Sequence, residues 1–115
     1  MVMELSERKV GRIRIVSIRG EAVINGKPER LSQSLRDHLE EGERLFVLNM
    51  ADCQRMDSSG LGELIKSHKL VADSEGLLKL ACVPLRLRGL IVVTNLTEVV
   101  EIFDSEQSAI NSFGA

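Results

Sequence analysis

The sequence predicts an α/β fold in which strands and helices alternate: a mixed, mainly parallel sheet that opens with a β-hairpin and is flanked by about four helices. Three observations lead to this prediction. Apolar and polar residues alternate near the N-terminus, nearly continuous apolar runs recur further along, and apolar residues at helical spacing separate those runs. The expected order is β-β-α-β-α-β-α-β-α, with right-handed crossovers between parallel strands.

The first three expected elements lie before residue 45. Residues 4–9 form a short strand, and Gly11 marks the turn into a second strand, where Ile13, Ile15 and Ile18 are the apolar positions. The segment Gly26-Lys27-Pro28 signals the start of a helix. Leu31, Leu35 and Leu39 recur every four residues and form one apolar stripe on this helix. Gly42 is expected to end the helix in the left-handed conformation.

The second half of the chain repeats the alternation. Strands are expected at residues 45–50, 77–83 and 99–103, and the first two read as strands covered on both faces. Helices are expected after Asp57, after Pro84 and after the N-cap candidates Asp104 and Ser105. Apolar residues at helical spacing in the first two of these helices are Leu61, Leu64, Ile65, Val71, Leu87, Leu90 and Ile91.

Length and composition exclude several classes of function. The chain has 115 residues, which predicts a single domain over residues 1–115. Fifteen Lys and Arg against seventeen Asp and Glu give a net charge of −2, which argues against direct nucleic-acid binding. No apolar run approaches the length of a membrane span, and the acidic N-terminus does not resemble a signal peptide, so a cytoplasmic location is expected.

Neither metal nor cofactor chemistry has a sequence signature here. Cys53 and Cys82 lie far apart and are expected to be reduced thiols, and neither His38 nor His68 has a cysteine or a second histidine at ligand spacing. The phosphate-binding loop and the dinucleotide-binding glycine motif are both missing from the sequence. We therefore expect no catalytic residue, no metal and no cofactor.

The most unusual junction between a strand and a helix is the segment 56–62, Met-Asp-Ser-Ser-Gly-Leu-Gly. Backbone N–H groups at the start of a helix are unpaired, and that end carries partial positive charge. One interpretation is structural: a serine hydroxyl caps the helix, and Gly60 and Gly62 permit a tight turn. The other is that a serine accepts a phosphate, whose oxygens the helix N-terminus receives.

This segment closely resembles the phosphorylation motif of the anti-sigma factor antagonists, which are single-domain bacterial STAS proteins. The resemblance covers nearly the whole chain. It includes the end of the second strand, the residues before the motif, an apolar helix after Pro84 and the start of the last helix. The matching positions are Gly20-Glu21, Val47-Leu48-Asn49, Asp57-Ser58-Ser59-Gly60-Leu61, Leu96 and Ser105-Glu106-Gln107-Ser108-Ala109.

The resemblance implies a function in partner switching. The unphosphorylated protein would bind an anti-sigma factor that is also a serine kinase, and binding would free the sigma factor. The kinase would then phosphorylate Ser58, the complex would dissociate, and a serine phosphatase would reset the cycle. The surface that meets the partner would include Asp57, Ser58, Ser59, Gly60 and Leu61, with Ser59 as a cap or turn residue.

The sequence departs from the family pattern at two places, and it leaves three other functions open. Residues 22–26 replace the usual Leu-Asp and small-residue helix start, which puts one partner contact in doubt, and Asn95 stands where glycine is common. The chain could instead be a STAS subunit of a lipid-transport or other membrane complex, without phosphorylation. It could be a scaffold of a stress-signalling assembly, or a small hydrolase that uses Ser58.

Overall fold

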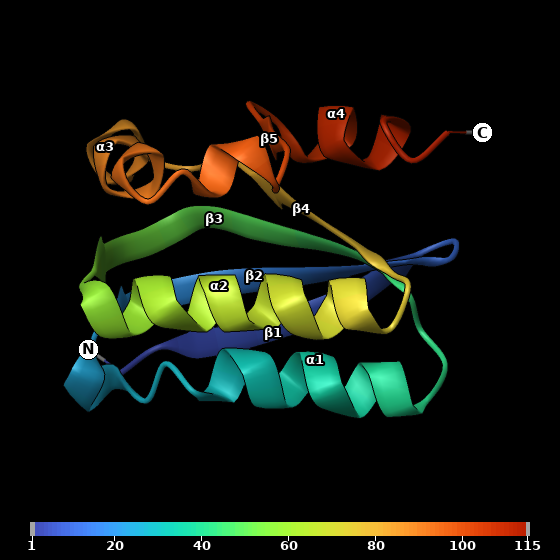
Figure 1. The fold of residues 1–115 in the computed structure, drawn as a ribbon, viewed down its shortest axis with the longest axis horizontal. Helices are drawn as coiled ribbons and strands as arrows, with labels where there is room; N and C mark the ends of the chain where they lie inside the picture. The colour runs from blue at the N-terminus through green and yellow to red at the C-terminus, as the bar shows by residue number, and fades with distance from the viewer. Residues whose placement is uncertain (1, 115) are drawn as a thin grey trace.

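Five strands form one sheet in the order in which they occur along the chain (Figure 1). The computed structural model describes residues 2–114. The first two strands are antiparallel, and every later pair is parallel. The strands are β1 (Glu4–Val10), β2 (Ile13–Ala22), β3 (Leu45–Met56), β4 (Leu77–Ala81) and β5 (Ile102–Phe103). The predicted α/β fold with an N-terminal hairpin is confirmed.

Helices cover both faces of this sheet. On one face α1 and α2 lie side by side and run in the same direction (Figure 1). The elements are α1 (Arg30–Glu40), α2 (Ser58–Asp73), α3 (Leu85–Val93) and α4 (Glu106–Asn111), with the 3-10 helices η1 (Ile24–Gly26) and η2 (Leu96–Glu98). The last of the four longer helices, α4, contacts β3, β4 and β5.

The apolar run in β3 serves two separate cores. Phe46 and Leu48 belong to the larger core, which contains the buried residues of α1, α2 and α3. Val47 belongs to a smaller core, where it lies with Ala109 of α4. Successive side chains of a strand point to opposite faces, so a strand between two layers of helix needs apolar residues at consecutive positions.

Two strands differ most in length from the prediction. β3 continues to Met56, six residues past the expected end at Met50, because it pairs with β2 as far as Ala22. Its extension contains exposed polar residues, so no hydrophobic pattern marks it. β5 is only two residues long, because residues 99–101, which the prediction placed in this strand, form a turn and irregular backbone after η2.

The turn predicted at Gly11 and the left-handed helix end predicted at Gly42 are both confirmed. Gly11 has φ +60° and Gly42 has φ +98°. Asn95 has φ +59°, so it adopts the left-handed conformation that glycine also favours. Asparagine tolerates this conformation better than most residues do, which makes the substitution a mild one.

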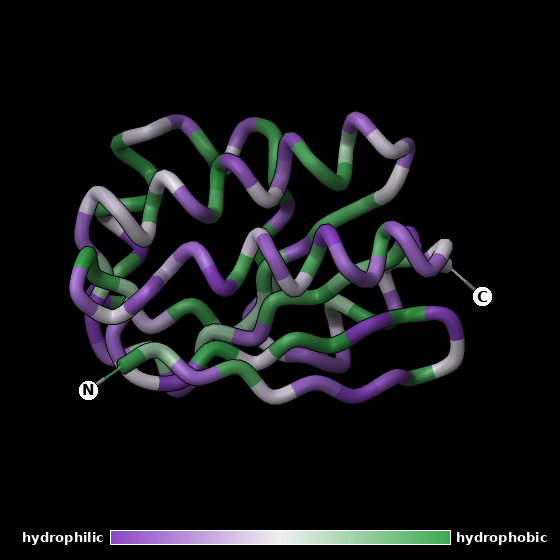
Figure 2. The backbone as a smooth tube through the Cα atoms, turned by 90° about the horizontal axis from the view of Figure 1, so that it is seen from below, coloured by the Kyte–Doolittle hydropathy of each residue, from purple (hydrophilic) through white to green (hydrophobic). Residues whose placement is uncertain are grey.

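Hydrophobic and hydrophilic residues alternate in short runs along the backbone (Figure 2). This distribution is typical of elements that bury one side and expose the other. Among the described residues, no helix has the length and apolar character needed to cross a membrane.

We predict that Leu48→Ala lowers the free energy of unfolding by about 2–5 kcal/mol, because it leaves a cavity in the larger core. Leu48 is fully buried, whereas Leu85 is 84% exposed. Leu85→Ala is therefore the matched control, and its free energy of unfolding is expected to stay within about 0.5 kcal/mol of the wild type. Chemical denaturation measures both variants, and equal losses would contradict the description of the core.

Candidate functional site

The segment singled out by its sequence lies where β3 ends and α2 begins. Asp57 is the last residue before the helix, and Ser58 is the first residue within it. In α/β sheets, binding sites form at the carboxyl ends of the parallel strands. The segment therefore occupies the edge of the sheet at which this fold class places functional residues.

The side chain of Asp57 caps α2. Its Oδ1 atom accepts hydrogen bonds from the backbone N–H groups of Ser59 at 2.9 Å and Gly60 at 3.2 Å. Its Oδ2 atom accepts a third, at 3.0 Å, from the N–H of Ile24 in η1. The expectation that a serine hydroxyl caps this helix is wrong, because the N–H groups of Ser59 and Gly60 donate to the side chain of Asp57 instead. Ser59 donates its backbone N–H to the cap and is not the capping residue.

The same hydrogen bonds keep Asp57 ionised. The bond from the Ile24 N–H is the largest cause that holds the pKa of the Asp57 carboxyl below its usual value, and the bonds from Gly60 and Ser59 add to it. Each of these donors stabilises the charged form. A negative charge is thus fixed beside Ser58 at neutral pH.

The five residues of the predicted partner surface differ in exposure. Ser58 is exposed, and Asp57 and Ser59 are half-buried. Gly60 and Leu61 are buried, and Leu61 packs in the larger core. A buried serine would have excluded modification by another protein, so the exposure of Ser58 is the property that the phosphoacceptor hypothesis requires.

Gly60 allows α2 to press against β2. A Cβ atom at this position would lie 2.0 Å from the carbonyl oxygen of Ala22, which is a backbone atom and cannot turn aside. At Gly62 the same atom would meet nothing within 4 Å. The prediction that both glycines permit a tight turn is therefore wrong. Both lie within α2, and Gly60 serves a close approach of two backbones.

Exposed apolar side chains lie in η1 and α3, at the same end of the sheet as the start of α2, and sequence reasoning missed them. Ile24, whose N–H binds Asp57, is 70% exposed, and Leu85 at the start of α3 is 84% exposed. The guanidinium of Arg86 donates to the carbonyl oxygens of Cys53 at 2.9 Å and Gln54 at 3.0 Å, which holds α3 against the end of β3.

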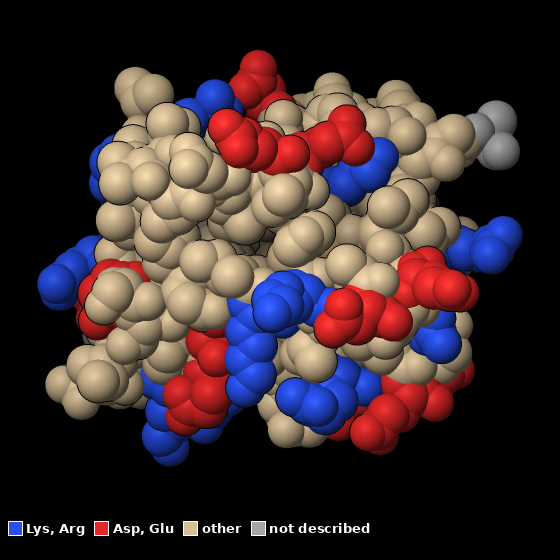
Figure 3. All heavy atoms as spheres, viewed as in Figure 1, with Lys and Arg blue, Asp and Glu red and all other residues tan. Residues whose placement is uncertain are grey.

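Figure 1 places α3 and the start of α2 at the same end of the sheet. The surface over α3 is largely free of charged side chains, whereas charges of both signs mix over α1 and α2 (Figure 3). Exposed apolar residues beside a polar segment are typical of surfaces that bind other proteins. Only the fold brings Ile24 beside Asp57, since the two residues lie far apart in the sequence.

The chain belongs to the STAS domain family, whose model matches residues 4–109. Its fold is shared by several solved structures. The Thermotoga maritima protein TM1081 has 22% sequence identity and a TM-score of 0.86, with 94% of this chain and 92% of that chain covered. The predicted resemblance to this family is confirmed.

Two further proteins of known structure have names that indicate different functions. The Bacillus protein SpoIIAA, an anti-sigma factor antagonist, has been solved unphosphorylated and phosphorylated. The phosphorylated form has 18% identity, a TM-score of 0.75, and coverage of 96% of this chain and 100% of that chain. A sulfate transporter family protein from Wolinella succinogenes has 26% identity, a TM-score of 0.75, and coverage of 85% and 81%.

We predict that Gly60→Ala lowers the free energy of unfolding by about 1–3 kcal/mol, because the added methyl group meets the backbone of Ala22. Gly62→Ala is the matched control in the same helix. It is expected to raise the free energy of unfolding by about 0.5–1 kcal/mol, since alanine restricts the unfolded chain and favours helix. Urea unfolding of the two variants checks the prediction, and a stable Gly60→Ala variant would refute the close approach.

The lowered pKa of Asp57 predicts a pH-dependent contribution to stability. A carboxyl whose pKa falls on folding stabilises the protein above its unfolded pKa, and that contribution is lost as the pH falls through the folded pKa. Asp57→Asn keeps a capping oxygen but removes the charge. The difference in unfolding free energy between wild type and Asp57→Asn should therefore shrink between about pH 7 and about pH 2. A difference that stays constant would contradict the assignment.

Proposed function

We propose that this protein is an anti-sigma factor antagonist that acts by partner switching, with Ser58 as its phosphorylation site. In this proposal the unphosphorylated protein binds an anti-sigma factor that is also a serine kinase, and the bound sigma factor is released. The exposed position of Ser58 in the first turn of α2, beside the capped carboxylate of Asp57, is the observation that carries the proposal.

The charge around Ser58 supports a switch in which phosphorylation breaks the complex. Phosphate brings about two negative charges at pH 7. The helix N-terminus favours an anion, but Asp57 already accepts the N–H groups of Ser59 and Gly60. A phosphate on Ser58 would therefore add to a negative charge that the fold already holds there. Inside a closely packed interface, that charge would meet desolvation and repulsion.

The apolar side chains near Ser58 support a protein as the partner. Ile24 and Leu85 present exposed hydrophobic surface at the same end of the sheet as Ser58. A partner that covered them would bury apolar area around the serine, and a charge introduced there would be poorly solvated. A loss of about 1.4 kcal/mol weakens binding tenfold, so a modest repulsion would be enough to separate the proteins.

The remaining parts of the proposal follow from this cycle. The chain supplies the serine that is modified and performs no catalysis itself, while a separate serine phosphatase removes the phosphate. Its effect on transcription is indirect, through the sigma factor, and it works in the cytoplasm without contacting nucleic acid. SpoIIAA, which is named as an antagonist of this kind and has been solved in a phosphorylated form, supports the proposal.

A second candidate function is that of a STAS subunit in a membrane transport complex. The similarity to the sulfate transporter family protein from Wolinella succinogenes favours it. In that case the same end of the sheet would bind a transport component, and Ser58 would stay unmodified. Co-purification with membrane transport proteins, unchanged by Ser58→Asp, would support this function over partner switching.

We predict that the cognate kinase and ATP add one phosphate to the wild type and to Ser59→Ala, but none to Ser58→Ala. Ser59 is the matched control because it is the adjacent serine, is half-buried and follows Ser58 in the same helix. Intact-mass spectrometry measures the added phosphate, and peptide mapping locates it. Modification of Ser59, or no modification of the wild type by its kinase, would refute the proposed site.

A further inference from the structure

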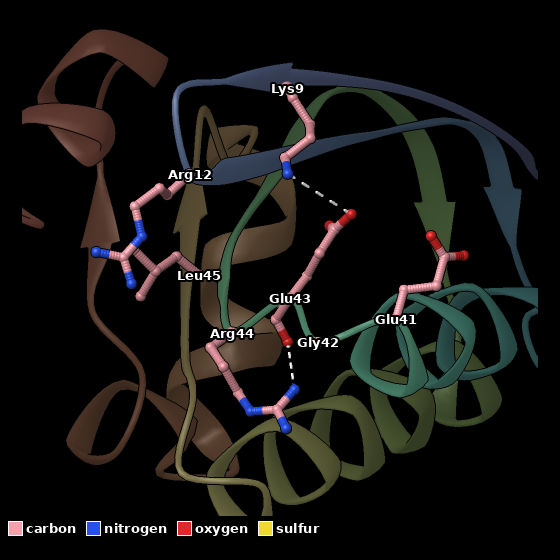
Figure 4. Close-up of a pocket in the computed structure, with 7 residues that line it drawn as sticks. All are labelled: Lys9, Arg12, Glu41, Gly42, Glu43, Arg44 and Leu45. Carbon is pink, nitrogen blue, oxygen red and sulfur yellow. Dashed lines mark hydrogen bonds and ion pairs between the residues drawn. The ribbon is translucent and has the colours of Figure 1, made fainter.

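At the opposite end of the sheet from Ser58, the loop after α1 meets the hairpin of β1 and β2 (Figure 1). A cavity of about 380 Å³ lies there. Figure 4 shows the side chains of Glu41 and Glu43 rising from this loop, with Glu43 directed toward Lys9. His38, from the last turn of α1, adds an imidazole to these two carboxylates.

We propose that His38, Glu41 and Glu43 form a binding site for a divalent transition-metal ion such as Zn²⁺. One potential ligand atom from each residue lies within 4.8 Å of the others. One imidazole and two carboxylates are ligands that Zn²⁺ accepts, with water in the remaining position. This inference is independent of the proposed function, because it concerns the other end of the molecule.

The His38 ring is held in place by a carboxylate at its Nε2 atom. Its Nε2 atom lies 2.5 Å from Oε1 of Glu7, and the hydroxyl of Ser34 holds the second oxygen of Glu7 at 2.6 Å. A carboxylate at Nε2 favours the tautomer that is protonated there, which leaves a lone pair on Nδ1. Histidines that ligate metals are commonly held in this way through their other ring nitrogen.

The surroundings of Nδ1 are a further argument. This atom is enclosed by protein and has no hydrogen-bond partner among residues 2–114. It lies 3.6 Å from Oε2 of Glu43, which is too long for a hydrogen bond. Two ligands at about 2.0–2.1 Å from a tetrahedral Zn²⁺ stand roughly 3.3 Å apart. The gap between the two atoms is thus close to the one that a shared metal ion requires.

The carboxylates fit the same site. Arg14 donates to both oxygens of Glu43, at 2.8 Å and 2.6 Å, and so fixes the carboxylate while each oxygen keeps a free lone pair. Glu41 is exposed and can turn toward the ion. The carbonyl end of α1 adds partial negative charge, whereas Arg14 and Lys9 oppose a cation and limit its affinity.

The two histidines of the chain allow a direct test by NMR of their imidazole resonances. His68 lies on α2, outside the cluster, and serves as the internal control. When Zn²⁺ is added to the full chain at about pH 7.5, only the His38 resonances should move and saturate near one equivalent, because metal ions bind the deprotonated ring nitrogen of histidine. Equal movement of both histidines, or no movement of His38, would overturn the proposal.

A pair of variants tests the carboxylates. Glu41→Gln should weaken Zn²⁺ binding about tenfold or more without changing the fold, because Glu41 is exposed. Glu40→Gln removes the same charge from the neighbouring exposed residue and should bind as the wild type does. Isothermal titration calorimetry measures both. Equal weakening in the two variants would mean that the ion responds only to surface charge, which would refute the site.

Discussion

The carboxylate of Asp57 connects three parts of this protein that the sequence separates. It follows β3, it satisfies two N–H groups at the start of α2, and it holds η1 through the N–H of Ile24. All three bonds go to one charged group, and charge-assisted hydrogen bonds of this kind are stronger than neutral ones. Ser58 therefore lies at a helix end whose position and charge are both determined by Asp57.

The residues of this segment have different structural roles. Asp57 supplies the cap, Gly60 supplies the close approach to β2, and Leu61 anchors the helix in the larger core. Ser58 is exposed, and its hydroxyl makes no hydrogen bond to any other residue within 2–114. A residue that the fold does not need is free to be modified, so phosphorylation could change the surface while the helix stays in place.

Local patterns in the sequence were enough for the order of elements. The stripe of Leu31 and Leu35, the left-handed Gly42 and the start of α2 at the serine segment all follow from periodicity and from the known preferences of residues at helix ends. The family resemblance then directed attention to Ser58. These features depend on residues that lie within a few positions of one another.

Features that depend on tertiary contacts could not be predicted in this way. The extension of β3 to Met56 exists because β2 pairs with it, although Asp52, Gln54 and Arg55 give the extension no apolar pattern. The cap was assigned to a serine because spacing alone does not show that Asp57 also binds Ile24. His38 was set aside because no cysteine or second histidine stands at ligand spacing from it, and the carboxylate at its Nε2 comes from another element, β1.

The central claim is that one charge at the start of α2 controls binding to another protein. The most direct measurement is the dissociation constant for the purified kinase partner, determined by calorimetry with the unmodified chain and with the chain phosphorylated on Ser58. The account predicts that phosphorylation weakens binding by about tenfold or more, which corresponds to about 1.4 kcal/mol. Equal dissociation constants for the two forms would contradict it.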